Sequence, residues 1–379
     1  MWIDTTSELA RVCDELKDAP YITLDTEFVR VKSYLPRLCL LQLGTGGEGV
    51  VVDCLAKGLS LEPVRSLLLD TSMPKVIHAA SQDFEIFQEI FGAVPTPVFD
   101  TQVAAAFLGL GDQIGYANLI HHLLRQEVDK SSQMTDWSLR PLTKRQIEYA
   151  LADVTHLAHA YEALQKRLEA KGRNEWLEPA LRSLEDSSRY VIEPYDAYKR
   201  IKIRRPKRKQ LAVLREVAAW RERRARERDL PRGWVLKDDS LVEIAMNPPR
   251  HEGDLRRVRN MNLKHREQQE LLSAVKHALQ LPEDQWPELP ARKSGPRPDD
   301  TLVALLQALL KLRCESFEVA PRLVATKDDL DALVAGTPTA KLQEGWRHEV
   351  FGSVADDLLN GRIGLTGDGA GRVRVLESN

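Results

Sequence analysis

Hydrophobic and polar positions divide the first 110 residues into extended and helical segments. Four segments are rich in apolar and β-branched residues and are bounded by Gly or Pro, which predicts strands: YITLDTEF (21–28), LCLLQLGT (38–45), GVVVDC (49–54) and PKVIHAA (74–80). The connections between the first three are too short for crossover helices, so these strands are candidates for antiparallel neighbours. LEPVRSLLLD and SQDFEIFQEIFG have helical periodicity, and Ser81 is the expected cap of the second.

A long helical tract follows from about residue 115 to residue 171. It is interrupted around DKSSQMTDWSLRPLT (129–143), after which Thr143 is the expected cap of a helix that ends at Gly172. Strands interleaved with helices predict an α/β domain in which helices flank a mixed sheet.

From about residue 209 onward the strand signals stop. Two helical segments follow, separated by WPELPARKSGPRPDD (286–300), which is rich in Pro and charge and is predicted to be a linker. The two segments look like an internal repeat, because VLKDDSLVEIA (235–245) and VATKDDLDALVA (324–335) share Lys-Asp-Asp before a Leu-rich helix start. Each segment is about 80 residues long, so its core is expected to be modest.

The composition is that of a globular protein. The chain has 379 residues, of which 43% are hydrophobic, and this length predicts two or three domains. We expect no transmembrane helix, because no apolar run is long enough, and no signal peptide, because the first residues lack a basic and an apolar region. The four cysteines form no CxxC pair, so neither a zinc site nor a disulfide framework is expected. A cytoplasmic, reducing setting without a membrane partner follows.

The net charge of −2 hides an uneven distribution. Residues 1–100 hold 15 Asp and Glu against 8 Lys and Arg, whereas residues 199–228 hold 14 Lys and Arg against 3 Glu. An acidic front followed by a basic middle favours a polyanion partner near a metal-loaded site. A solvated basic helix is the simpler alternative, but the lack of any acid from Lys199 to Lys209 favours the polyanion.

Five side chains form a candidate catalytic constellation. Asp25 and Glu27 end the first predicted strand two residues apart, so their side chains share one face. Asp83 lies near the start of a helix, and Tyr149 and Asp153 share a face of the long helix because they are four residues apart. Converging carboxylates repel one another unless cations lie between them, and hard oxygen ligands suit Mg²⁺ or Mn²⁺. Two such ions about 4 Å apart promote phosphodiester hydrolysis.

Each part of the constellation also has an ordinary explanation. A strand-terminal Asp-x-Glu is often a surface turn, and Asp83 is favourably placed at the positive end of a helix dipole. Tyr149 and Asp153 are also compatible with a half-buried helix pair. Their order, spacing and placement at strand ends and helix starts together favour a metal-dependent site.

These motifs make the chain similar to the ribonuclease D family, in the tyrosine-containing branch of the 3′–5′ exonuclease superfamily named for its four acids. The resemblance rests on LDTEF, HAASQDFEIF and YALADV, together with DWSLRPLTKRQIEYALADV, and covers roughly residues 1–205. The two repeats resemble the helical HRDC module, and the second copy, with GWRHEVFG and LLNGRIGL, fits the tail of that module better. No motif residue departs from the family pattern.

The resemblance implies a fold and a set of domains. A ribonuclease H-like 3′–5′ exonuclease domain, with a mixed sheet flanked by helices, is expected over 1–172. A basic connector over 173–208 follows. Two small all-α HRDC-like domains are expected over 209–290 and 299–370.

The resemblance also implies roles for the five residues in a two-metal hydrolysis. Asp25 would bridge both ions, Glu27 and Asp153 would complete the shell of the ion that activates water, and Asp83 would hold the second ion. Tyr149 would orient the attacking water by a hydrogen bond. With an ordinary phenol pKa of about 10, Tyr149 is not expected to be the principal base at neutral pH.

Several further residues are candidates for substrate binding. His78 either contacts a phosphate or the 3′ nucleotide or is a satisfied core histidine, and Phe28 either stacks on the terminal base or belongs to the core. Trp137 and Arg140 are candidates to shape the substrate groove. Basic residues are expected to bind the RNA backbone through phosphate contacts, which carry little sequence information: Lys202, Arg204, Arg205, Lys207 and Arg208.

The sequence thus indicates a metal-dependent 3′–5′ exoribonuclease that releases nucleoside 5′-monophosphates. By resemblance, its substrates would be tRNA precursors and other small structured RNAs with a single-stranded 3′ end, and the protein would be a monomer. One alternative is a 3′–5′ exonuclease acting on DNA, although no helicase or polymerase motif accompanies the acids. Another is a non-catalytic RNA-binding scaffold, which the intact acid set disfavours.

Overall fold

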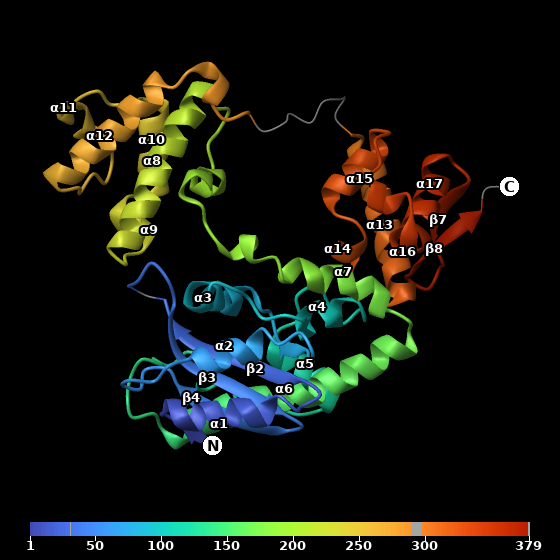
Figure 1. The fold of residues 1–379 in the computed structure, drawn as a ribbon. Helices are drawn as coiled ribbons and strands as arrows, with labels where there is room; N and C mark the ends of the chain where they lie inside the picture. The colour runs from blue at the N-terminus through green and yellow to red at the C-terminus, as the bar shows by residue number, and fades with distance from the viewer. Residues whose placement is uncertain (31, 290–297, 378–379) are drawn as a thin grey trace. The chain divides into compact units, whose positions relative to one another are not determined.

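The computed structural model describes residues 1–30, 32–289 and 298–377 (Figure 1). The chain forms two compact units. The first contains the described residues of 1–27, 40–187 and 294–379, and the second those of 28–39 and 188–293. None of the described helices is both long enough and apolar enough to span a bilayer.

A six-stranded mixed sheet organises the first unit, in the order β1-β4-β3-β2-β5-β6. β3 and β4 are antiparallel, with Leu41 opposite Val52, whereas β1 is parallel to β4 and β2, β5 and β6 are parallel to one another. The four predicted strands are present. β1 and β6, which have two and three residues, were not predicted. The strands are β1 Trp2–Ile3, β2 Ile22–Val29, β3 Arg37–Thr45, β4 Glu48–Asp53, β5 Lys75–Ile77 and β6 Val98–Asp100.

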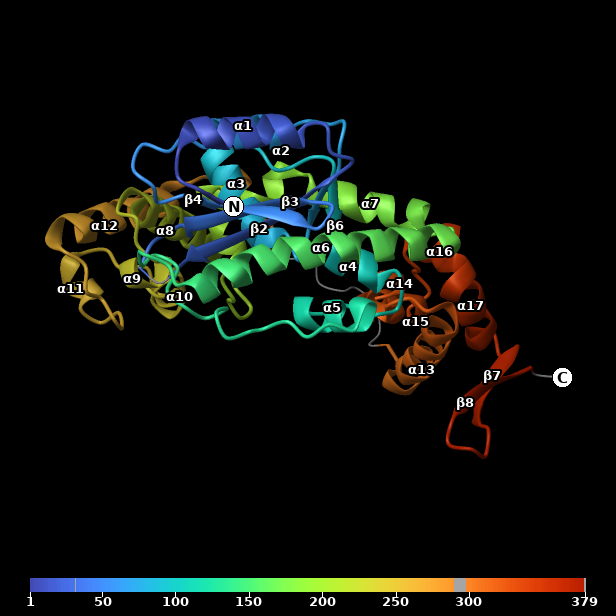
Figure 2. The same ribbon diagram turned by 90° about the horizontal axis from the view of Figure 1, so that it is seen from below.

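Helices cover both faces of this sheet, as expected for the α/β class. Figure 2 shows α1 and α2 on one face and α6, with α5 beside it, on the other. Apolar residues of β5, β6, α4 and α6, such as Val76, Phe99 and Leu157, pack into one buried cluster. The helices are α1 Thr6–Leu16, α2 Glu62–Leu68, α3 Ser81–Phe91, α4 Thr101–Ala106, α5 Tyr116–Leu124, α6 Lys144–Ala170 and α7 Asn174–Leu184.

Local capping fixes where the functional helices begin. Thr143 caps α6 as predicted: its Oγ1 accepts from Gln146 N at 3.3 Å, and Gln146 Oε1 accepts from Thr143 N at 3.0 Å. The prediction that Ser81 caps α3 is wrong, because Ser81 is the first residue of the helix and makes no capping bond. The carboxylate of Asp100 accepts from the preceding amides instead, at 3.2 Å from Ala79 N and 2.9 Å from Ala80 N. An acid 20 residues away in sequence is not a local signal.

The second unit is helical, with one segment drawn from far away in the sequence. Residues 28–39, which include the last two residues of β2 and the first three of β3, belong to it. Tyr34 is 5% exposed in its core and donates a hydrogen bond from its hydroxyl to Glu222. Arg232 donates to the same carboxylate at 2.7 and 2.8 Å and lies over the Tyr34 ring. The helices are α8 Arg208–Glu227, α9 Arg232–Val235, α10 Asp238–Met246, α11 Glu252–Leu255 and α12 His265–Gln280.

The C-terminal segment repeats the order of these helices. A long helix, a four-residue helix and a helix starting at Lys-Asp-Asp come first, and a short 3₁₀ turn and a final helical stretch follow. These elements are α13 Asp300–Phe317, α14 Pro321–Val324, α15 Lys327–Val334, η4 Ala340–Leu342, α16 Gly345–Arg347, η5 His348–Gly352 and α17 Ser353–Leu359. Residues 290–297 of the predicted linker lie outside the described residues.

The expectation that the C-terminal segment is wholly helical is wrong. β7 (Ile363–Gly367) and β8 (Val373–Glu377) form an antiparallel hairpin. Its turn is DGAG (368–371), where Gly369 and Gly371 have φ values of 80° and 87°, a region that favours glycine. Apolar alternation in VRVLE beside a Gly-rich turn is an ordinary hairpin signal, and the helical pattern before it obscured it.

Contacts within the first unit join α13–α17 to the α/β part. Arg173 is buried and donates to the Phe107 carbonyl at 2.5 Å, to the Glu318 carbonyl at 2.6 Å and to the Phe317 carbonyl. The rings of Trp176 and Trp346 stack with centroids 4.6 Å apart. The first part of the expected connector, residues 173–187 with α7, therefore belongs to this unit, and residues 188–208 belong to the second.

Candidate active site

Three of the predicted carboxylates meet in the structure. Asp25 and Glu27 extend from within β2 and not from its end as predicted, because the strand continues to Val29. Asp153 extends from the N-terminal half of α6. One carboxylate oxygen from each lies within 4.8 Å of the other two. The spacing of two along the strand and the position of α6 against the sheet thus bring the side chains to one point.

Asp83 lies beside this group. It is in the first turn of α3, is 8% exposed, and accepts a hydrogen bond from the hydroxyl of Thr26. Its negative charge raises the pKa of both Asp25 and Glu27, after the larger effects of burial and of Asp153. The role of Thr26 was not predicted, because a hydroxyl residue between two acidic residues in a strand has no sequence signature of its own.

Burial and mutual repulsion make this site strongly unfavourable for negative charge. Burial, followed by the charges of Asp153 and Asp83, raises the pKa of Glu27 to about 9, and burial and the same neighbours raise the pKa of Asp25 well above its usual value. Burial raises the pKa of Asp83 and of Asp153 to about 7. In the described part of the chain, none of the four forms an ion pair with Lys or Arg.

Divalent cations fit this donor set. Oδ1 of Asp153 is buried and has no hydrogen-bond partner among the described residues. Four carboxylates supply the hard oxygen ligands that Mg²⁺ and Mn²⁺ prefer, and bound cations relieve the repulsion that raises their pKa values.

Tyr149 is placed beside the carboxylates by the same helix. It lies one turn before Asp153, and the phenol partly offsets the effect of burial by lowering the pKa of the Asp153 carboxyl. Burial and the nearby charges of Asp153, Glu27 and Asp25 raise the pKa of Tyr149 further above its usual value. The phenol is therefore a hydrogen-bond donor at neutral pH. Its ring packs against buried Trp137, with centroids 6.0 Å apart.

His78 follows β5 directly and is half-buried. Its Nδ1 lies 3.0 Å from Thr101 Oγ1, and burial lowers its pKa. Its ring contacts Tyr116, whose hydroxyl donates to the backbone carbonyl of Asp153. Tyr116 therefore fixes α6 at Asp153. A tyrosine at the start of an amphipathic helix carries no sequence signal of this role.

Arg140 braces the loop before α6. It donates to both Asp53 oxygens, at 3.0 and 2.6 Å, and to the Trp137 carbonyl at 2.8 Å. These bonds tie the loop to the end of β4. Arg140 therefore shapes this part of the site as a support for Trp137 and Tyr149.

The remaining substrate-binding candidates belong to the second unit. Lys202, Arg204, Arg205 and Lys207 are exposed, and none forms an ion pair with another described residue. Arg208 is engaged within the unit: it pairs with Glu288 at 2.8 Å and donates to the Trp286 carbonyl at 3.0 Å. Phe28 is half-buried directly after Glu27.

Comparison with known proteins identifies the class. A family model described as 3′-5′ exonuclease matches residues 1–169, and the HRDC domain model matches residues 210–271. The chain is thus a 3′–5′ exonuclease that carries an HRDC domain. One of the two expected HRDC domains is supported in this way.

Full-length relatives identify the family. Ribonuclease D of Gluconacetobacter diazotrophicus is 45% identical over 98% of this chain and 96% of its own length, and that of Acidiphilium cryptum is 42% identical over 99% and 96%. A crystal structure of Escherichia coli RNase D, described as an exoribonuclease involved in structured RNA processing, has a TM-score of 0.78 at 32% identity and covers 95% of this chain and 98% of that one. The chain belongs to the ribonuclease D family. It is a hydrolytic 3′–5′ exoribonuclease that depends on divalent metal.

Proposed function

We propose that Asp25, Glu27, Asp83 and Asp153 hold two divalent ions, Mg²⁺ or Mn²⁺, and that hydrolysis releases nucleoside 5′-monophosphates one at a time from RNA 3′ ends. The observation that carries this proposal is the meeting of Asp25, Glu27 and Asp153 within 4.8 Å, beside buried Asp83. When bound, the ions supply an activated water and stabilise charge on the phosphate.

The protein's own groups position these components. Thr26 fixes the Asp83 carboxylate by donating to it, and Tyr116 fixes the backbone of Asp153. Tyr149 orients the attacking water by donating a hydrogen bond to it from the phenol. Because its pKa is raised, it acts as a donor throughout the neutral range rather than as the base.

The proposed substrates are tRNA precursors and other small structured RNAs with a single-stranded 3′ end. The HRDC match over 210–271 supports a second region of nucleic-acid contact. Phe28 remains the proposed stacking surface for the terminal base, and His78 remains a proposed contact to a phosphate or to the 3′ nucleotide. The proposed phosphate contacts are Lys202, Arg204, Arg205 and Lys207, with Arg208 supporting them from within the unit.

The domain organisation is proposed in the same terms. We place the exonuclease domain at 1–172, the connector at 173–208, and HRDC-type domains at 209–290 and 299–370. The shared order of helices in α8–α12 and α13–α17 supports the second HRDC-type domain. We further propose that the protein is a monomer and acts in the cytoplasm.

Matched RNA and DNA oligonucleotides, labelled at the 5′ end and incubated with Mn²⁺ or Mg²⁺, test the proposed substrate class. We expect a one-nucleotide ladder from RNA and much slower shortening of DNA. Equal or faster shortening of DNA would favour the DNA exonuclease. Strands that bind without shortening in every metal would favour the scaffold.

A further inference from the structure

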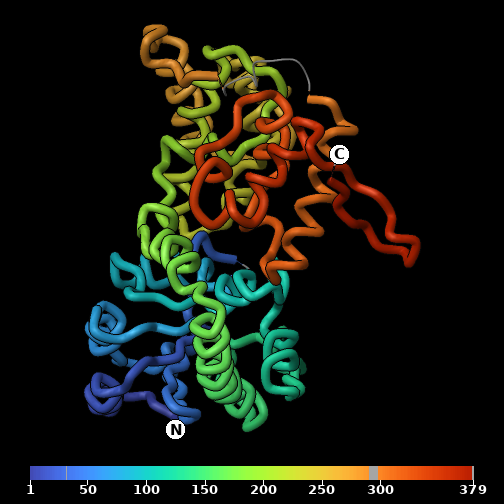
Figure 3. The backbone as a smooth tube through the Cα atoms, turned by 90° about the vertical axis from the view of Figure 1, so that its right-hand side faces the viewer, coloured from blue at the N-terminus to red at the C-terminus, as the bar shows by residue number. Residues whose placement is uncertain are grey.

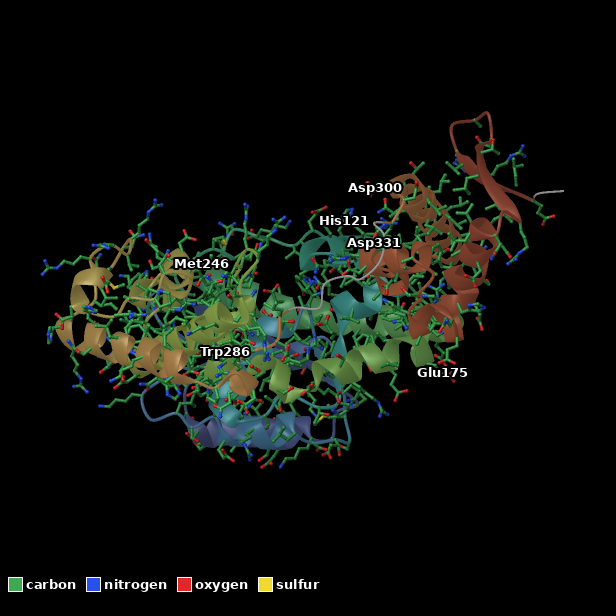
Figure 4. The ribbon with its side chains drawn as sticks, turned by 90° about the horizontal axis from the view of Figure 1, so that it is seen from above. His121, Glu175, Met246, Trp286, Asp300 and Asp331 are labelled. Carbon is green, nitrogen blue, oxygen red and sulfur yellow. The ribbon has the colours of Figure 1, made fainter. Side chains whose placement is uncertain are left out.

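A basic cavity lies far from the carboxylates, within the first unit. It has a volume of about 600 Å³ and is bordered by α5, the C-terminal end of α6, and α13 with the turn that follows it. His122, Arg167, Lys171 and Lys311 line it, against two acids, Glu315 and Glu318. The side chains that surround α5 can be followed in Figure 4, where His121 is labelled.

The walls of this cavity are fixed to each other. Arg173 joins the Phe107 carbonyl to the carbonyls of Phe317 and Glu318, and Ala320 N donates to the Ala106 carbonyl at 2.9 Å. Gly109 has a φ of 72°, and a Cβ there would lie 2.7 Å from the carbonyl carbon of Glu318, so the backbones touch. The cavity is therefore formed in the free protein.

Ion pairing leaves part of the positive charge unneutralised. Lys171 pairs with Glu318 at 2.6 Å, and Lys311 is 4.0 Å from Glu315 on its own helix. Arg167 is exposed and forms no ion pair with another described residue. Burial, followed by the nearby Arg167, Arg125 and His121, lowers the pKa of His122.

Helix geometry aligns this cavity with the active site. Arg167 follows Tyr149 by 18 residues of α6, which at 3.6 residues per turn is about five whole turns, or about 27 Å at 1.5 Å per residue. The two side chains therefore lie at the same angular position on α6. α5 packs beside α6 (Figures 2 and 3). This distance corresponds to about eight nucleotides at 3.4 Å per stacked nucleotide, and to fewer in an extended strand.

We propose that Arg167, supported by His122 and Lys311, binds phosphates of the RNA strand several nucleotides upstream of the 3′ end that occupies the carboxylate site. This inference rests on the proposed function, since the upstream direction is defined by that site. The simpler alternative is that Arg167 only complements the negative end of the α6 dipole. In that case, replacing Arg167 would lower the stability of the fold and leave RNA binding unchanged.

Substrate length separates these possibilities. Arg167→Gln is compared with Lys166→Gln, which removes the same charge from the neighbouring exposed residue, about 100° around the helix. Both are assayed on a trinucleotide, which is too short to reach the cavity, and on an unstructured RNA of about 15 nucleotides. We expect Arg167→Gln to raise KM roughly fivefold for the long RNA, with kcat unchanged, and to leave the trinucleotide unaffected.

Binding of the long RNA in EDTA provides a readout that does not depend on catalysis. The plot of log affinity against log salt should become shallower by about 0.7 for Arg167→Gln and stay as in the wild type for Lys166→Gln. Arg167→Lys should restore most of the binding. Equal effects of Arg167→Gln and Lys166→Gln on the long RNA, or equal losses on both RNAs, would overturn the inference. Failure of the wild type to hydrolyse either RNA would instead overturn the proposed function. The salt dependence of binding in EDTA would still decide whether Arg167 binds RNA phosphates.

Discussion

Asp25→Asn is expected to lower kcat by roughly a thousandfold or more while leaving RNA affinity within a few-fold of the wild type. The substitution keeps the shape of the side chain but removes the charge of one of the three carboxylates that meet within 4.8 Å. Metal affinity should fall as well, because a neutral amide replaces an anionic ligand. Single-turnover hydrolysis and calorimetric titration with Mn²⁺ measure the two effects.

Asp14→Asn is a suitable control for this variant. Asp14 lies on α1 in an exposed pair with Lys17, so the same chemical change there should leave hydrolysis unaltered. Hydrolysis by Asp25→Asn within about tenfold of the wild type would contradict the assignment of the site.

Metal-free protein is expected to be less stable at pH 8 than at pH 6, by roughly 3 kcal/mol or more from the carboxylate cluster, since Glu27 alone contributes about 1.4 kcal/mol per pH unit. The folded-state pKa values of Glu27, Asp83 and Asp153, about 9, 7 and 7, are raised above their unfolded values. Between pH 6 and 8 the folded state therefore binds more protons than the unfolded state, so stability is lost as pH rises. Mn²⁺ should reverse this trend, because deprotonated carboxylates bind it better at pH 8.

Glu27→Gln isolates this effect from other titrating groups. It removes the carboxylate with the pKa of about 9, so the metal-free variant should be more stable than the metal-free wild type at pH 8 and show a weaker pH dependence. Denaturant unfolding in EDTA at both pH values measures the difference. A variant that is less stable than the wild type at pH 8 would show that the cluster is not electrostatically strained.

The features that could be predicted from the sequence are those with local causes. The i,i+2 spacing of Asp25 and Glu27 and the capping of α6 by Thr143 depend on backbone geometry near in sequence. The four predicted strands showed their own hydrophobic patterns.

The contacts that could not be predicted join residues that are distant in sequence. Asp100 satisfies the start of α3, Tyr116 anchors Asp153, and Tyr34 lies in the core of the helical unit, and no local pattern encodes these contacts. The C-terminal hairpin is a different case: its alternation and glycines were present in the sequence, but a helical repeat was expected to continue through them.

The most direct test of the account uses one RNA sequence in two forms, linear with a free 3′ hydroxyl and covalently circular. With Mn²⁺, the linear form should shorten one nucleotide at a time and release nucleoside 5′-monophosphates, EDTA should abolish the reaction, and the circle should remain intact. Cleavage of the circle, or a linear RNA that stays at full length in every divalent metal, would contradict a 3′–5′ exonuclease site built on Asp25, Glu27, Asp83 and Asp153.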